Sequence, residues 1–125
     1  MLIPGGQFRI FLYPKPLDMR AGYDRLAQIC KSEIGMNPYG GAIFLFFNRQ
    51  RNRARIYFYD GSGSCLFSKR LERGRFKIPT VAPSFAYAVV ESSELSLLLE
   101  GADIGKIIRP KRWLPDSAPT KDSPP

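Results

Sequence analysis

Residues 42–63 read AIFLFFNRQRNRARIYFYDGSG, and this stretch predicts the centre of the fold. Residues 42–47 are apolar at every position, which is typical of a strand covered on both of its faces. In residues 54–59 aliphatic or phenylalanine side chains alternate with arginine or tyrosine, which predicts a second strand. The polar residues 48–53 between these two strands predict a hairpin tip. Asp60-Gly61 then favours a second tight turn, because Asp-Gly accepts positive φ, with a return strand at residues 64–69.

The residues before this stretch predict one strand and one helix. The alternating side chains of residues 7–13 predict a strand. The prolines that follow end it, because they cannot continue a ladder of backbone hydrogen bonds. Asp18 is then expected to be the N-cap of a helix, because its carboxylate can accept from the free amides of the first turn. Gly35 is expected to end that helix in a left-handed conformation. Its apolar stripe consists of Met19, Tyr23, Leu26, Cys30 and Ile34.

The residues after it predict two short strands and a second helix. The strands are expected at residues 75–78, closed by Pro79, and at residues 87–90. Ser92 or Ser93 is expected to cap a helix that runs through Glu100. Its buried side should carry Leu95, Leu98 and Leu99.

Length and composition predict a single α+β domain over residues 1–114. The chain has 125 residues, of which 44% are hydrophobic, which is enough for one core without a metal or a disulfide. We expect a mostly antiparallel sheet of about five strands with one or two packed helices. Residues 115–125 are rich in proline and poor in apolar residues, so we expect them to form a disordered tail.

Composition also argues against several kinds of chemistry. The chain has no histidine, which removes the histidine-dependent nucleophiles and zinc sites. Cys30 and Cys65 each stand in an apolar segment and are interpreted as free thiols, although the sequence leaves a disulfide open. Four acids could suggest a metal-dependent nuclease, but each has a plainer local role; these are Asp18, Asp24, Asp60 and Asp103. We therefore expect no enzyme activity, metal, cofactor or small-molecule ligand.

The N-terminal residues and the short apolar runs indicate the compartment. The longest apolar stretch is far shorter than the roughly 20 residues that cross a bilayer, so we expect no membrane association. The first residues lack the pattern of a signal peptide. We therefore expect a cytoplasmic protein.

The excess positive charge is concentrated in one segment. The chain carries a net charge of +8, and residues 49–77 account for +7, from nine basic and two acidic residues. Such a concentration is typical of a surface that binds a polyanion. The nine candidate residues for nucleic-acid binding are Arg49, Arg51, Arg53, Arg55, Lys69, Arg70, Arg73, Arg75 and Lys77.

Each part of this basic segment has a structural alternative. The hairpin tip with Arg49, Arg51 and Arg53 could be a basic finger on phosphates or a solvated loop, and its unmixed charge favours the finger. Residues 69–76 could grip phosphates or form an ordinary charged turn. The row of Arg55, Tyr57 and Tyr59 could stack unpaired bases, but coverage by the first helix is the favoured interpretation.

Five motifs, in register, resemble a known family. They are Asp18-Met19-Arg20-Ala21-Gly22-Tyr23-Asp24, Phe46-Phe47-Asn48-Arg49-Gln50-Arg51, Tyr59-Asp60-Gly61-Ser62-Gly63, Lys69-Arg70-Leu71-Glu72-Arg73-Gly74-Arg75-Phe76 and Leu98-Leu99-Glu100-Gly101-Ala102-Asp103. The chain thereby resembles the small accessory protein, called TnpB, of the insertion sequence 66 family of bacterial transposable elements. In that family a separate transposase carries the catalytic acids.

The resemblance implies an accessory role in transposition without chemistry of its own. The leading hypothesis is a protein that binds DNA, at the ends of the element, and assists the cognate transposase. The alternatives are an adaptor that binds the transposase without contacting DNA, and a nucleic-acid-binding regulator of the element.

Overall fold

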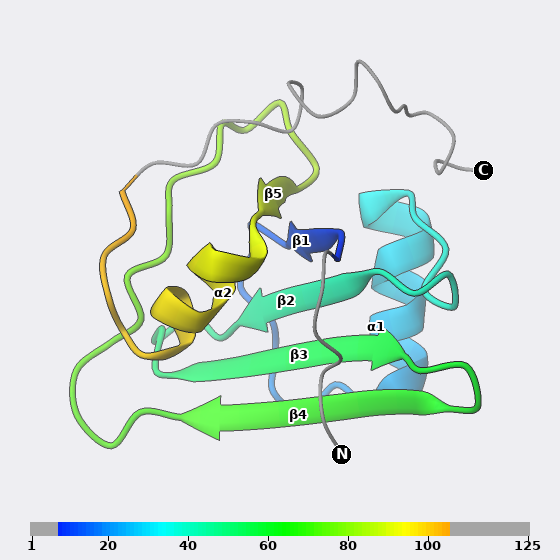
Figure 1. Cartoon of the computed structure of the whole chain (residues 1–125), viewed down its shortest axis with the longest axis horizontal. Coiled ribbons are helices and arrows are strands. Elements are labelled where there is room, and N and C mark those ends of the chain that lie inside the picture. The colour runs from blue at the N-terminus through cyan, green and yellow to red at the C-terminus, as the bar shows by residue number, and fades with distance from the viewer. Residues whose placement is uncertain (1–7, 106–125) are drawn as a thin grey trace.

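Five strands form one open sheet in the order β4-β3-β2-β1-β5 in the computed structural model, which describes residues 8–105 (Figure 1). Only β1 and β2 run parallel, and the other three neighbouring pairs are antiparallel. The strands are β1 Ile10–Leu12, β2 Ile43–Phe47, β3 Arg53–Tyr59, β4 Ser64–Arg70 and β5 Ala88–Val90. The helices are α1 Tyr23–Ile29, which continues into the π-helical turn η1 Cys30–Ile34, and α2 Ser92–Leu99. The predicted α+β fold with a mostly antiparallel sheet is therefore confirmed.

Strand β2 lies at the centre of the sheet and is buried on both faces, as its unbroken apolar run predicts. Side chains from alternate positions belong to two separate hydrophobic cores: Leu45 to one and Phe44 to the other. Helix α2 covers the first core with Leu95 and Leu98, and α1 covers the second on the opposite face (Figure 1). The two short helices thus cover opposite faces of the sheet.

The first helix begins later than the sequence predicts. It starts at Tyr23 after Gly22, and Asp18 is not its N-cap. The Asp18 carboxylate instead accepts hydrogen bonds from the backbone N–H and the guanidinium of Arg20. Residues 18–21 form a turn, closed by a bond from the Ala21 N–H to the Asp18 carbonyl at 3.0 Å. The predicted end is correct, because Gly35 adopts φ +83° directly after η1.

The C-terminal elements differ from the predictions in two places. The N-cap of α2 is Glu91 rather than Ser92 or Ser93, and the Glu91 N–H donates to the Glu94 carboxylate at 2.9 Å. Residues 75–78 form no strand. Phe76 is buried and its two neighbours are exposed, so burial alternates along this segment as it would in a strand. The segment nevertheless pairs with no strand in the described residues. The alternation arises because Phe76 fills the core next to Phe47, at a ring distance of 5.1 Å, and Ile78 packs against the same core.

Both cysteines are free and they pack on opposite faces of the sheet. Cys30 lies within the α1 core and is completely inaccessible to solvent, whereas Cys65 is only partly buried on β4. Burial raises the pKa of the Cys30 thiol to about 12. At neutral pH this thiol is both protonated and shielded.

We expect a thiol reagent to distinguish the two cysteines. The thiolate is the reactive form, so native protein near pH 8 should be alkylated at Cys65 long before Cys30. In denaturant both should react at similar rates. Peptide mapping after timed alkylation measures this, and equal reactivity in the native protein would contradict the burial of Cys30.

Candidate nucleic-acid interface

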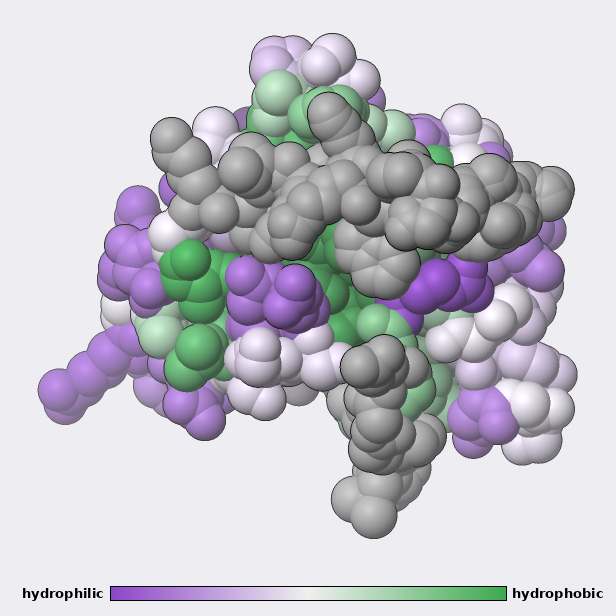
Figure 2. Space-filling model, turned by 45° about the horizontal axis from the view of Figure 1, so that its top comes forward, coloured by the Kyte–Doolittle hydropathy of each residue, from purple (hydrophilic) through white to green (hydrophobic). Residues whose placement is uncertain are grey.

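The two basic segments of the chain meet at one end of the sheet. The β2–β3 turn is held against residues 71–76 by two backbone hydrogen bonds, from Leu71 N–H to the Asn52 carbonyl at 2.8 Å and from Phe76 N–H to the Arg51 carbonyl at 2.7 Å. Hydrophilic side chains project from this end of the molecule, at the left in Figure 2. We call this region the basic end; its exposed cations are Arg49, Arg51, Arg53, Lys69, Arg70, Arg73, Arg75 and Lys77.

Arg55 is the one candidate cation that is not exposed. Its guanidinium lies under the turn before α1 and donates to the backbone carbonyls of Met19 and Ala21. The next residue in its row, Tyr57, is 1% exposed and packs in the α1 core. The helix-covered interpretation thus holds for Tyr57, whereas Arg55 is covered by the turn before α1 and Tyr59 is only partly buried. Because Arg55 holds two carbonyls that a helix starting at Asp18 would use, it also explains why α1 begins only at Tyr23.

Lys69 is exposed but engaged. Its Nζ donates to the carbonyl of Leu99 at 2.8 Å. Leu99 is the last residue of α2, where unpaired carbonyls carry partial negative charge. Lys69 therefore links β4 to the C-terminal end of α2. Of the other seven exposed cations, only Arg70 forms an ion pair within residues 8–105, with Glu72.

Asn48 organises the β2–β3 turn. Its side-chain oxygen accepts from the backbone N–H groups of Asn52 and Arg53, each at 3.0 Å. Its side-chain NH₂ donates to the oxygens of Gln50 and Asn52. Asn48 is only 9% exposed, and it holds a turn in which Arg51 adopts the left-handed φ of +61°. Sequence reasoning assigned Asn48 merely to a turn and missed this role.

The basic end has two sides. Arg53 and Arg70 emerge on the face of the sheet that α1 covers, since they share the parity of Tyr57 and Leu66 on their strands. Arg51, Arg75 and Lys77 line a different hollow, near the residues that follow α2. The nine candidates therefore do not form one flat patch; the exposed ones surround the end of the sheet.

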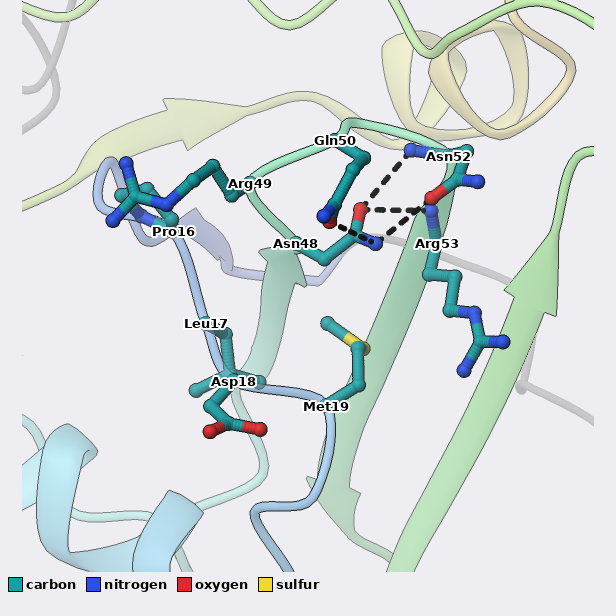
Figure 3. A pocket seen from close by; sticks show the side chains of 9 residues that line it. All are labelled: Pro16, Leu17, Asp18, Met19, Asn48, Arg49, Gln50, Asn52 and Arg53. Atoms are coloured by element: carbon teal, nitrogen blue, oxygen red, sulfur yellow. Dashed lines mark hydrogen bonds between the residues drawn. The ribbon is translucent and has the colours of Figure 1, made fainter.

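The hairpin hollow, of about 750 Å³, lies between the β2–β3 turn and the turn before α1 (Figure 3). Leu17 and Met19 supply apolar surface, and Asn48, Gln50 and Asn52 supply amides. The remaining lining residues are Pro16, Asp18, Arg49 and Arg53. Residues from the first and second family motifs, far apart in the sequence, thus face one another across a single depression.

The one carboxylate that lines the hairpin hollow is already neutralised. The guanidinium of Arg20 lies 2.6 Å from the Asp18 carboxylate and lowers the pKa of that carboxyl to about 2. Asp18 thus remains ionised and paired at any physiological pH. The local field in the hollow is set by the unpaired Arg49 and Arg53.

The residues that the structure describes offer no metal centre and no membrane span. Within 8–105 there is no group of three or more histidine, cysteine, aspartate or glutamate residues placed to hold a metal. In the same part of the chain no helix is both long and apolar enough to span a bilayer.

The fold and the surface thus define a small α+β domain with a basic end. Its similarity to known proteins identifies the family. The family described as IS66 Orf2 like protein matches residues 8–109. The chain belongs to this family, a class of transposition-associated accessory proteins, which confirms the resemblance seen in its motifs.

Two similar proteins come from Sinorhizobium fredii (strain NBRC 101917 / NGR234), and both are described as uncharacterized. The chain is 39% identical to y4hO over 103 residues, which covers 82% of this chain and 88% of the relative. It is 35% identical to y4jC over 121 residues, which covers 97% and 98%. No solved structure matches the chain.

Proposed function

We propose that the chain is a non-catalytic accessory factor that binds DNA at the ends of the transposable element and assists a separate transposase. The observation that carries the proposal is the composition of the basic end. Six of its exposed cations form neither an ion pair nor a hydrogen bond through their side chains within residues 8–105: Arg49, Arg51, Arg53, Arg73, Arg75 and Lys77. An ordinary solvated surface mixes charges of both signs, whereas a surface for a polyanion leaves its cations unpaired.

The shape of the basic end supports contacts to phosphates. Two turns held together by backbone bonds present arginines on both sides of the sheet end. Arginine binds phosphate oxygens through two parallel N–H groups, which fixes orientation as well as supplying charge. Contacts of this kind position a protein on a duplex and carry little sequence information. The transposase or the element's DNA structure would then supply the specificity.

We expect DNA binding to depend steeply on salt. Each phosphate contact releases counterions and contributes about 0.9 to the log–log slope of affinity against salt concentration. Fluorescence anisotropy with a labelled duplex of the element end, titrated at several salt concentrations, measures this slope. A slope of about 4 or more would correspond to most of the unpaired cations contacting phosphates.

The same titration decides between DNA binding and the adaptor alternative. Adding purified transposase at each salt concentration tests whether the two proteins bind the duplex together. No binding to any nucleic acid at low salt, together with a stable complex with the transposase alone, would replace the DNA-binding proposal by the adaptor.

A further inference from the structure

Two arginines stand directly opposite each other at the corner of the sheet. Arg53, at the start of β3, is the register partner of Arg70, at the end of β4. Partners in an antiparallel pair place their side chains on the same face about 5 Å apart at Cβ, where two like charges destabilise the sheet. Both residues are exposed, and within residues 8–105 the only carboxylate paired with either is that of Glu72, 3.3 Å from the Nε of Arg70.

A third guanidinium adds to the positive charge at this corner. Arg55 follows Arg53 on the same face of β3 and is the diagonal neighbour of Arg70. Its terminal nitrogens bind backbone carbonyls, which do not cancel its charge, and its Nε is buried without a hydrogen-bond partner in the described structure. Of these three guanidinium groups, only that of Arg70 is paired with a carboxylate within residues 8–105, that of the highly exposed Glu72.

A hollow of about 420 Å³ lies between these groups. The side chains of Arg53, Arg70 and Ser68 all emerge on the face that lines it, because Arg53 is the register partner of Arg70 and Ser68 that of Arg55. These groups can donate several hydrogen bonds to one acceptor-rich ligand. We call this arrangement the corner site; its residues are Arg53, Arg55, Ser68, Arg70 and Glu72.

We propose that the corner site binds one phosphate group, held by Arg53 and Arg70 with the Ser68 hydroxyl as a further donor. A dianion or diester between the two guanidiniums replaces their repulsion by two charge-assisted contacts. The exposed pair between Arg70 and Glu72 contributes little and leaves the terminal nitrogens of Arg70 free.

The assignment of this phosphate to a DNA strand rests on the proposed function. Arg53 also lines the hairpin hollow, whose other free cation is Arg49. A DNA strand that places one phosphate in the corner site can therefore continue past Met19 toward Arg49 (Figure 3). Inorganic phosphate presents the same chemistry without the strand, so the site itself is testable without DNA.

The test compares thermal unfolding of the full chain in sodium phosphate and in sodium chloride at equal pH and ionic strength. At about ten times its dissociation constant, bound phosphate should raise the melting temperature by roughly 4–8 °C. Arg53→Gln and Arg70→Gln should each abolish most of this rise. In chloride at low ionic strength, Arg53→Gln should melt slightly higher than the parent protein, because the repulsion is gone.

Arg75→Gln is the matched control. It removes the same charge from the other side of the basic end and should keep the full rise in phosphate. A rise that survives in both Arg53→Gln and Arg70→Gln, or no rise in the parent protein, would overturn the corner site. Competition by phosphate against a labelled duplex then identifies the source. If phosphate stabilises through both arginines and no DNA binds, the site stands and the DNA-binding function fails separately.

Discussion

Replacing Asn48 by alanine is expected to lower the free energy of unfolding by about 2–3 kcal/mol. The side chain is 9% exposed, and its oxygen is the acceptor for the N–H groups of Asn52 and Arg53. Removing it leaves two backbone donors without a partner in a partly buried position, and each such group costs about 1–3 kcal/mol. Chemical denaturation followed by circular dichroism measures the loss as a lower midpoint at unchanged slope.

Asn48→Asp is the informative companion variant. A carboxylate keeps an acceptor for both N–H groups and adds a negative charge among unpaired arginines. We expect it to retain most of the stability that the alanine variant loses. Equal destabilisation by both substitutions would show that the side-chain NH₂ of Asn48, rather than its oxygen, holds the turn.

The central strands could be predicted from the sequence because their signals are local. The short apolar run of β2 is typical of a strand covered on both faces. Strand β3 carries an alternating pattern, and the Asp60-Gly61 turn that follows it needs positive φ. Gly61 adopts φ +104°, and the Asp60 carboxylate accepts from the N–H groups of Ser62 and Gly63. Nothing distant in the chain is needed to specify this hairpin.

The errors arise where a distant side chain takes over a local hydrogen bond. Asp18 has the composition of an N-cap, but Arg55, 34 residues beyond Ala21, binds the carbonyls that the first turn of such a helix would use. Residues 75–78 alternate in polarity because Phe76 enters the core, not because a strand pairs there. Sequence periodicity reports burial, and burial alone does not distinguish a strand from a loop that is anchored by one aromatic ring.

The sequence indicates which residues belong to the candidate site, but not how their side chains are arranged in space. The two basic segments within residues 49–77 lie at one end of the molecule because the β3–β4 hairpin returns the second segment beside the first. The sequence cannot show that Arg55 is withdrawn beneath a turn, nor that Arg53 and Arg70 share one register position. Both facts depend on the pairing of strands, which a one-residue shift would change.

Changing Arg49, Arg51 and Arg53 together to alanine is expected to leave the fold intact and to impair DNA binding strongly. All three side chains are exposed and none forms an ion pair within the described residues. Surface substitutions of this kind change stability by no more than about 0.5 kcal/mol each. Each lost phosphate contact should lower the salt slope by about 1, so the triple variant should lose close to three units of slope and bind more weakly to every duplex.

The matched control removes positive charge elsewhere. Arg25 and Lys31 are exposed on the helical segment at the far end of the molecule (Figure 1). Their double change to alanine lowers the net charge by two without altering the basic end. For each charge removed, we expect this variant to lose much less DNA affinity, and much less salt dependence of that affinity, than the triple variant. The reason is that attraction between charges is screened beyond about 10 Å at ordinary salt. If the two variants lose affinity equally per charge, binding depends on net charge alone. If the triple variant fails to fold, the three arginines stabilise the turn that presents them and their role is structural.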